Sequence, residues 1–525
     1  MENVEAHQFS EQFSRYLSDE ASIIKNGFAE KIFFPKNENE ISIIIKEANS
    51  IEIPVTISGG GTGLSGGRAP LGGWIIATDN MVTLEEDEGN SIRWQDVEVK
   101  KTYQVHLEEI NHNKALLTVP VSMTIKSIQN FVKDSGWFYP PDPTERSAFI
   151  GGNVTTNASG ARSFKYGSTR DWVHSLRVVT PTGEILILSR DDTSVIDKNY
   201  IHLKYNNTIK KISRPKYKVS NVRKNVAGPI IHDTSHPIDL FIGTDGLFGV
   251  ITQVTLNLIR QPEQISNIMV YCDSVEQSFN LIELCREQRD LNLWPIPLSV
   301  EYLDENAVKI IRSRKQIQDS VKSIVILEQD TSNEDDFDKA IDFWINVFEK
   351  LGIQETSVAL SAKEIENHKE IRHAVPETVN SIVRKHSQSK LGTDYSVPPR
   401  NFKDIFHRVF EIGEEFEKYQ NARVPLGDSF GYAFWAHAGD SHVHLNLLPR
   451  NDEEYIFAKN KLFDLMKQVV LWEGSIAAEH GLGKKRFDGK PALFYMYGQE
   501  GLDEIKNMKL EFDPLNLLNR GNLID

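Results

Sequence analysis

The chain has 525 residues, of which 40% are hydrophobic and 25% are charged, and it carries a formal net charge of −15. This length exceeds what one hydrophobic core usually serves, so two or three domains are expected, and the composition is typical of a soluble globular protein. The acidic balance argues against binding of nucleic acid or of an anionic membrane through bulk charge.

The cysteines and the N-terminal segment indicate the compartment. Cys272 and Cys285 form no CxxC motif, so the sequence holds no cysteine-ligated iron–sulfur cluster and no disulfide framework. The acidic start MENVEAHQFSEQF has no apolar signal-peptide core. No apolar run approaches the ~20 residues that a membrane-spanning helix needs. The sequence therefore predicts a cytoplasmic protein without a transmembrane segment, either free or peripheral to a membrane.

The first half of the chain predicts alternating strands and helices. A strand at KIFFP and a helix at NENEISIIIKEAN precede the apolar strand IPVTI, a glycine-rich loop and the strand WIIAT. A helix is expected over 122–134 with Ser122 as its N-cap. A loop rich in proline and glycine spans 137–168, and strands follow at SLRVVT and EILIL.

Residues 201–226 carry eight lysines and arginines and no acidic residue. Two interpretations stay open at this point. The segment is a solvated loop, or it supplies positive potential near an anionic substrate or an electron-accepting partner. Lys224 is the last basic residue of this stretch.

From about residue 262 the pattern changes. Two units of strand, helix and strand predict a second domain built on an antiparallel sheet with helices on one face. A hairpin follows, from YAFWAH to HVHLNLL around the turn AGDS, and a last helix leads into the tail DPLNLLNRGNLI. The expected fold class is α+β with two domains.

Six glycines lie between residues 59 and 67, a density that lets a backbone approach phosphates closely. Gly61, Gly63 and Gly66 satisfy the GxGxxG pattern, but a Rossmann site needs a helix directly after them. Pro70 and Gly72–Gly73 prevent that helix, and a strand follows instead. The flanking apolar strands favour a tight buried turn over a flexible surface loop.

Three histidines, His437, His442 and His444, lie within eight residues. On a strand, His442, His444 and Asn446 share one face, and His437 is expected to face His444 across the hairpin. With Glu479, this cluster indicates a metal site. Two imidazoles and a carboxylate would leave coordination positions open, as a catalytic site requires.

Three segments resemble the vanillyl-alcohol oxidase / p-cresol methylhydroxylase flavoprotein family. They are PVTISGGGTGLSGG, the stretch from YPPDPTERSAF to STRDWV, and GTDGLFGVITQVTL, in which Asp245 replaces the usual glutamate. The resemblance implies FAD without a Rossmann helix, and non-covalent FAD, because residues 57–68 contain no histidine that could tether it. The implied FAD-binding residues are Gly59, Gly60, Gly61, Thr62, Gly63, Gly66, Pro141, Asp142, Gly151, Gly152, Asn153, Asn157, Gly160, Gly243, Gly249 and Ile251.

WAHAGDSHVHLNLLP and GSIAAEHGLGKKR resemble the HxGDxxxHxN and GxxxxEHGxG motifs of one branch of that family. This is the D-lactate, glycolate and D-2-hydroxyglutarate dehydrogenase branch. The resemblance implies a zinc or manganese ion on His437, His444 and Glu479, with His480 as the base. His442 stands where the branch usually has asparagine, and its role stays open.

Two further segments resemble the same branch. EIRHAVPETV makes Arg372 the candidate clamp for a substrate carboxylate, since a guanidinium binds both oxygens. Asn446 is a further candidate substrate contact. LGTDYSVPPRNF resembles a segment that lines the boundary between flavin and cap, with Lys390 loosely matching a basic residue found before it.

The resemblance implies an FAD-dependent dehydrogenase that oxidises a small D-2-hydroxy acid and passes electrons to a quinone, a cytochrome or an electron-transferring flavoprotein. Residues 1–260, completed by 485–525, are expected to form the FAD-binding domain, and 261–484 the substrate-binding cap. Two alternatives are a non-redox flavoenzyme of the alkyl-dihydroxyacetonephosphate synthase type and a non-catalytic FAD-carrying protein that relays electrons within a complex.

Overall fold

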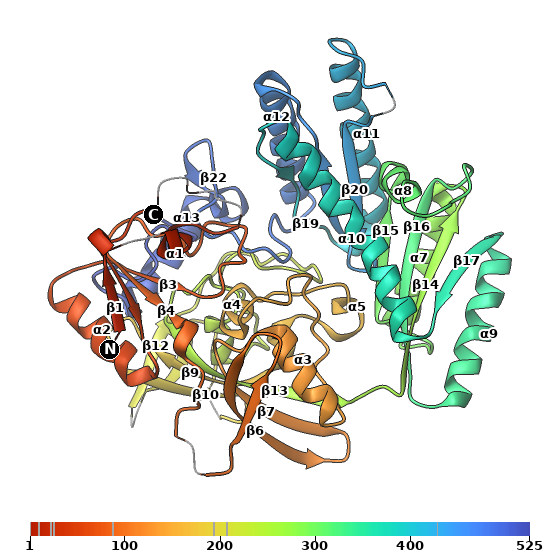
Figure 1. The fold of residues 1–525 in the computed structure, drawn as a ribbon. Coiled ribbons are helices and arrows are strands. Elements are labelled where there is room, and N and C mark those ends of the chain that lie inside the picture. Colours follow the sequence, from red (N-terminus) through yellow and green to blue (C-terminus); the bar gives the residue numbers. More distant parts are fainter. Residues whose placement is uncertain are drawn as a thin grey trace.

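The computed structural model describes residues 2–8, 11–20, 24, 27–86, 89–192, 195–205, 208–427 and 429–525. The N-terminal half and a later sheet form two neighbouring bodies, and both marked chain ends lie with the first of them (Figure 1). No helix in these ranges combines the length and apolar character needed to cross a bilayer.

The first sheet carries the glycine-rich loop. Its strand order is β1 (Glu2–Glu5), β2 (Lys31–Phe34), β4 (Trp74–Ala77) and β3 (Val55–Ser58). Strands β2, β4 and β3 are parallel, and α2 (Glu38–Ser50) buries its predicted apolar stripe against them. The loop from residue 59 to residue 73 leads from β3 into β4 without a helix, which confirms that this is no Rossmann site.

The second sheet is antiparallel and has the order β10-β9-β13-β7-β6-β5, with β8 paired to β13. Its strands are β5 (Ile92–Asp96), β6 (Lys101–Asn111), β7 (Lys114–Pro120), β8 (Trp137–Phe138), β9 (Val173–Val179), β10 (Ile185–Ser189) and β13 (Val250–Arg260). Helix α3 (Ile125–Asp134) begins later than predicted. Its N-cap is Thr124, whose hydroxyl accepts from the Ser127 amide, whereas Ser122 donates to the Met81 carbonyl.

Short elements connect these sheets. They are η1 (Ala6–Gln8), α1 (Glu11–Ser14), η2 (Arg15–Leu17), η3 (Thr78–Asn80), α4 (Ile150–Thr156), α5 (Ser163–Tyr166), α6 (Thr169–Trp172), the hairpin of β11 (Tyr200–Tyr205) and β12 (Thr208–Ser213), and η4 (Pro237–Phe241).

The third large sheet belongs to the cap, and its order is β17-β14-β16-β15-β20-β21-β18, with β19 paired to β21. All its pairings are antiparallel, as predicted. Its strands are β14 (Gln264–Cys272), β15 (Ser299–Leu303), β16 (Ser323–Thr331), β17 (Glu355–Ala359), β18 (Leu391–Gly392), β19 (Tyr395–Ser396), β20 (Tyr432–His437) and β21 (His442–Leu447). The 3-10 helices η5 (Pro399–Asn401) and η6 (Ala438–Asp440) complete it.

The prediction that helices cover one face of this sheet is wrong. Helices α7 (Val275–Asp290), α9 (Glu334–Lys350), α11 (Phe402–Asn421) and α12 (Asp452–Leu471) share one core with the FAD side of the molecule. Helices α8 (Glu305–Arg312) and α10 (Ala362–Lys385) form a separate core on the opposite face. The strands are apolar on both faces over much of their length, so alternation alone could not reveal the second layer.

The C-terminal segment returns to the first sheet. After β22 (Arg486–Phe487) and β23 (Lys490–Pro491), α13 (Leu493–Phe512) leads to the tail, whose Leu517 carbonyl accepts from the Val55 amide. The Asn519 side chain accepts from the Ile57 amide at 2.9 Å. These contacts support the assignment of the tail to the FAD-binding body. The exact domain boundaries stay a prediction.

Ion pairs join the two bodies. Arg162 donates two hydrogen bonds to Glu328 of β16 at 2.7 and 2.8 Å, and both side chains are buried. Lys165 contacts Asp330 on the same strand at 2.6 Å. The Lys165–Asp330 pair is partly buried, whereas loss of either partner of the Arg162–Glu328 pair would leave a buried charge without compensation, so the Arg162–Glu328 pair fixes how the two bodies meet.

Candidate active site

The candidate site lies on the face of the cap sheet that turns toward the α8 and α10 side. Strand alternation sends Phe434, Val443 and Leu445 into the core on the α11 side. The intervening residues, His437 of β20 together with His442 and His444 of β21, therefore share the other face. Glu301 of β15 lies on that face as well, since Leu303, two residues further along the same strand, packs in the α8 and α10 core.

The hairpin register differs from the prediction. His437 is paired directly with His442, and His444 stands opposite Trp435. The connection is the helical turn η6 followed by Ser441 in a left-handed conformation, with φ of 54°. The three imidazoles still gather, with ring centroids 4.2 to 5.4 Å apart.

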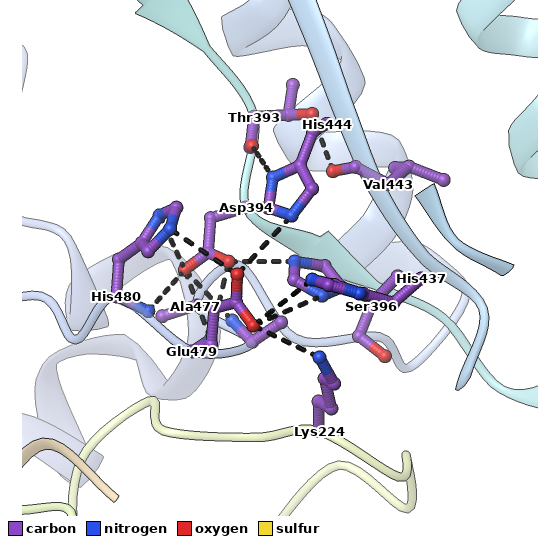
Figure 2. Close-up of polar contacts among 12 residues, drawn as sticks. Lys224, Thr393, Asp394, Ser396, His437, Val443, His444, Ala477, Glu479 and His480 are labelled. Atoms are coloured by element: carbon purple, nitrogen blue, oxygen red, sulfur yellow. Dashed lines mark hydrogen bonds and ion pairs between the residues drawn. The ribbon is translucent and has the colours of Figure 1, made fainter. Parts of the chain in front are cut away.

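Glu479 lies at the centre of the cluster (Figure 2). Its Oε2 is 3.5 Å from His437 Nε2 and 4.0 Å from His442 Nδ1, and its Oε1 is 3.4 Å from His444 Nε2. Burial alone would raise the pKa of Glu479, but Lys224 and His437 hold that pKa well below its usual value. The carboxylate is therefore ionised.

One ring nitrogen of each imidazole donates a hydrogen bond to a carboxylate or carbonyl oxygen. His437 Nδ1 donates to Glu301 at 2.6 Å, His442 Nε2 to Asp394 at 2.8 Å, and His444 Nδ1 to the Thr393 carbonyl at 3.1 Å. Since carboxylates and carbonyls only accept, the proton of each neutral ring sits on that side. The other nitrogen of each ring therefore carries no proton, and its lone pair is directed toward Glu479. This arrangement is typical of metal-ligating histidines.

These side chains fit a divalent cation. The ligand atoms of His437, His442, His444 and Glu479 all lie within 4.8 Å of one another, and His442 Nδ1 is buried without a hydrogen-bond partner among the described residues. A buried nitrogen in that state is explained by an ion that accepts its lone pair. The predicted ligands His437, His444 and Glu479 are thus brought together, and their role as ligands stays a prediction.

Asp394 orders the segment that carries Glu479 and His480. Its carboxylate accepts from the backbone amides of Ala478, Glu479 and His480 at 3.0 to 3.3 Å, besides the His442 imidazole. Sequence reasoning placed residue 394 only in a boundary segment. The segment LGTDYSVPPRNF around Asp394 carries a family resemblance, but nothing in its pattern links this aspartate to the histidine cluster.

His480 occupies the outer side of the cluster, opposite His437 and Lys224 (Figure 2). Its side chain is 30% exposed, whereas those of His437, His442 and His444 are at most 8% exposed. Its Nε2 lies 3.5 Å from Glu479 Oε1. Partial burial lowers the pKa of His480, which favours a neutral imidazole that can accept a proton.

Arg372, on α10, contacts Glu301, and Glu301 in turn accepts from His437. The predicted carboxylate clamp is therefore linked to the histidine cluster through one buried acid. Burial would raise the pKa of Glu301, but His437 and Arg372 keep that pKa far below its usual value. Sequence reasoning missed Glu301, which lies in a strand far from every motif.

Lys224 is the residue of the basic stretch that enters the site. Its side chain is fully buried, and its Nζ lies 3.0 Å from Glu479 Oε2. The solvated-loop interpretation is therefore wrong for Lys224, although Lys218 in the same stretch is exposed. Lys224 comes from the FAD-binding body and Glu479 from the second half of the chain, so the site forms between them.

Asn446 continues the face of His442 and His444. It is buried, and its side-chain amide donates to the His444 carbonyl at 3.2 Å. Lys390 lies with its Nζ 5.8 Å from the Trp435 ring, beside the strand that carries His437. No contact of either side chain with the central carboxylate is found in the described part of the chain, and the substrate role of Asn446 stays a prediction.

The three predicted FAD segments are neighbours in space. A Cβ on Gly60 would lie 3.4 Å from Phe149, which joins the glycine loop to the second segment. The Gly243 amide donates to the Val154 carbonyl at 3.0 Å, and the Asp245 amide to the Thr155 carbonyl at 2.9 Å. These contacts bring the third segment against the second.

Several predicted FAD residues also have packing roles. A Cβ on Gly160 would collide with the Asp142 carbonyl at 2.0 Å, and Gly249 is confined by Val178. The Asp142 carboxylate accepts from Arg146 at 3.1 Å, and the Asn157 side chain from the Arg170 amide at 2.8 Å. Pro141, Gly151, Asn153 and Ile251 are partly or fully buried.

Three glycines lack such an explanation. A Cβ on Gly59 or Gly152 would meet no described atom within 4 Å, and one on Gly63 would meet only Asp19 at 3.9 Å. None of the three has a positive φ. Neither protein packing nor backbone conformation therefore requires glycine there, and close approach of a cofactor would. This fits FAD phosphates lying against the loop.

Further contacts connect the glycine-rich loop of residues 59–73, the predicted flavin loop, to the candidate metal site. Asp245 Oδ2 accepts from the amides of Leu482 and Gly483 at 3.3 and 2.9 Å. The Lys484 amide donates to the Ser65 carbonyl at 2.9 Å, inside the glycine-rich loop. One short segment, 479–484, thus touches both the histidine cluster and the flavin loop.

FAD binding can be tested with Gly59→Val. We expect the unmodified protein to purify yellow and to release intact FAD on denaturation, while the variant folds but carries at most about a tenth of the flavin, because a branched side chain fills the space for the cofactor. Absorbance at the flavin bands and circular dichroism measure this. Gly489→Asn in the β22–β23 turn is the matched control. A variant with full flavin content contradicts the assignment.

Fold and site together define a two-domain flavoprotein. A model of the FAD binding domain matches residues 29–189, and a model of FAD linked oxidases, C-terminal domain, matches residues 261–523. The second match alone spans half of the chain. The chain therefore belongs to the FAD-linked oxidase family. This confirms the predicted α+β fold of the p-cresol methylhydroxylase type, and it supports FAD as the cofactor.

Similar proteins cover nearly the whole chain. D-lactate dehydrogenase from Archaeoglobus fulgidus is 25% identical over 498 residues, which are 93% of this chain and 90% of that protein. Glycolate oxidase subunit GlcD from Bacillus subtilis is 24% identical, covering 94% and 88%. D-2-hydroxyglutarate dehydrogenase from Stutzerimonas stutzeri is 23% identical, covering 94% and 90%.

A solved structure of alkyldihydroxyacetonephosphate synthase superposes with a TM-score of 0.61 at 13% identity, covering 94% of this chain and 76% of that one. At this identity the likeness shows the fold alone.

Proposed function

We propose that this protein is an FAD-dependent dehydrogenase that oxidises a small D-2-hydroxy acid to the 2-oxo acid with the help of a divalent metal. The observation that carries the proposal is the cluster of three imidazoles and Glu479. Lys224 contacts Glu479, Arg372 contacts Glu301 beside the cluster, and residues 479–484 connect the cluster to the glycine-rich loop. The relatives named for D-lactate, glycolate and D-2-hydroxyglutarate support the same substrate class.

The charges of the site favour a carboxylate substrate only when a metal is bound. Three acids, the buried Glu301 and Asp394 and the partly buried Glu479, stand against the two cations Lys224 and Arg372. With the imidazoles counted in the neutral form that metal binding requires, these groups sum to one net negative charge, and a divalent cation makes the sum positive. Attraction of an anion then follows from Coulomb's law in a poorly screened site.

Each chain residue has a proposed task. Arg372 binds the substrate carboxylate with the part of its guanidinium that Glu301 leaves available. His480, at the exposed side of the cluster, accepts the proton of the substrate hydroxyl. A bound divalent cation would lower the pKa of that hydroxyl, and FAD held by the glycine-rich loop would supply the hydride acceptor for C2. Glu301, Asp394 and the Thr393 carbonyl hold the imidazoles in the tautomers that metal binding requires.

The two alternatives are less well supported. A synthase reaction without net redox rests on a likeness that shows the fold alone. A protein that only relays electrons has no use for a buried cluster of histidines and carboxylates with this degree of order.

Anaerobic reduction of the flavin tests the proposal. The FAD- and metal-loaded protein is mixed with a panel of D- and L-2-hydroxy acids, and bleaching of the flavin is followed with time. We expect bleaching by at least one D-acid and slow or no bleaching by its L-enantiomer. Failure of every acid, with dithionite still reducing the flavin, would overturn the proposal.

Arg372→Lys tests the carboxylate clamp. Lysine keeps the positive charge for Glu301 but loses the bidentate fork, so we expect KM to rise about 10- to 100-fold, the equivalent of one charge-assisted hydrogen-bond pair. The decrease in kcat should be smaller. Arg314→Lys, nearby but outside the site, is the control. An unchanged KM would make Arg372 a structural partner of Glu301.

A further inference from the structure

His442 is the least explained histidine of the cluster. It is fully buried, its Nε2 is engaged with Asp394, and its Nδ1 has no hydrogen-bond partner among the described residues. An unpaired buried nitrogen is unfavourable unless a ligand takes its lone pair. The other predicted ligands, His437 and His444, also present their free nitrogens to Glu479.

The strand register gives His442 the same access to the centre as the predicted ligands. His442 is the direct cross-strand partner of His437 and lies two residues before His444, so all three rings leave the same face of the hairpin. The His442 ring centroid is 4.2 Å from that of His444, closer than the 5.4 Å between His437 and His444. The His437 and His442 centroids are 5.1 Å apart, so His442 is at least as close to each of the other two rings as those two are to each other.

We infer that His442 Nδ1 is a fourth protein ligand, so that the site binds its metal through three imidazoles and Glu479. This inference rests on the proposed metal-assisted function and goes beyond it in ligand number and in metal preference. Bonds of about 2.0–2.1 Å from nitrogen to zinc bring ligand atoms within about 3–4 Å of each other, and the observed spacing needs only a small contraction.

Three nitrogen ligands have a consequence for the metal. Imidazole suits zinc, cobalt, nickel and iron, whereas manganese and magnesium prefer sites rich in oxygen. An imidazole at position 442 therefore favours zinc-type ions over manganese. Four protein ligands still leave two positions of a six-coordinate ion for the hydroxyl and carboxylate oxygens of a substrate.

Asp394 explains why His442 presents Nδ1 and not Nε2. Its Oδ1 accepts the Nε2 proton, while its Oδ2 accepts the His480 amide at 3.0 Å. The same carboxylate thus orients a ligand and positions the proposed base. His442→Asn keeps a polar side chain of similar reach from the backbone, and Asn is what the resembling branch usually has there.

X-ray absorption of the zinc-loaded, FAD-containing protein tests the inference without any variant. Three imidazoles in the zinc shell support it. Two imidazoles overturn the role of His442 and leave the proposed function standing. Absence of stoichiometric zinc by elemental analysis, after chelation and reloading, overturns the metal site itself and this inference with it.

Metal affinity gives a second test. Competition with a chromogenic chelator should show that His442→Asn weakens zinc binding about 10²-fold or more and weakens manganese binding much less, because only the nitrogen-preferring ion loses a favoured ligand. Flavin content should stay unchanged. His368→Asn is the matched control, since His368 is buried in the cap but is bonded to Asn267 and Ser357. Equal zinc affinity in wild type and His442→Asn overturns the inference.

Discussion

Removal of the metal is expected to stop reduction of the flavin by substrate while leaving FAD bound. A metal that binds the substrate oxygens supplies several kcal/mol to the transition state, so exhaustive chelation should slow anaerobic bleaching by about 10³-fold. Zinc should restore the rate. His444→Ala and Glu479→Ala should resemble the chelated enzyme, because each removes a proposed ligand from the cluster.

The control is His112→Ala, which changes an exposed histidine in the turn between β6 and β7. It should keep the metal content and the bleaching rate of the unmodified protein. Full activity in a preparation shown to be metal-free would end the metal hypothesis. If the Glu479→Ala variant lost FAD together with the metal, Glu479 would instead support the glycine-rich loop proposed to bind the flavin.

His480→Asn is expected to slow flavin reduction about 10²-fold or more, the usual contribution of a positioned general base. The substitution leaves the backbone amide of residue 480, which donates to the Asp394 carboxylate, so the segment 479–484 should stay in place. The imidazole stands at the exposed side of the cluster, with its Nε2 3.5 Å from Glu479 Oε1, and with Asp394 and Glu479 it also forms a second group that could hold a metal ion. Rapid-mixing measurements of the reductive half-reaction give this rate.

Metal and flavin content separate the possible outcomes for His480. A slow variant with normal zinc, FAD and substrate affinity supports the base. A variant that loses zinc makes His480 a ligand. An unchanged rate would exclude His480 as the base, and the proton acceptor would have to be sought among the other imidazoles.

The elements of the fold that rest on local patterns could be predicted from the sequence. The apolar stripe of α2 and the strands around the glycine loop follow from periodicity and from glycine and proline positions. Ser122 is a good N-cap residue for α3, but Thr124 competes equally well two residues later and is the cap in the structure. The second helix layer of the cap could not be predicted, because strands buried on both faces lose their alternation.

The candidate site was predictable only where its residues lie close in sequence. The histidines of the hairpin and the Glu479–His480 pair are visible because each forms a short motif. Glu301 has no motif around it, and the motif around Asp394 does not show that this aspartate orients His442. The register error at His437 had a physical cause as well: the turn is a 3-10 helix with Ser441 left-handed, and local residue preferences do not determine its length.

The segment 479–484 limits how this chain could be recombined with its relatives. A crossover between the two halves would separate Lys224 and Asp245 from Glu479 and Gly483, the residues they contact. Space between position 245 and Gly481 is tight, since a Cβ built on Gly481 would lie only 2.8 Å from the Asp245 carboxylate. A parent with glutamate at position 245 would place one more methylene in this space. Hybrid enzymes should therefore inherit positions 224, 245 and 479–484 together from one parent.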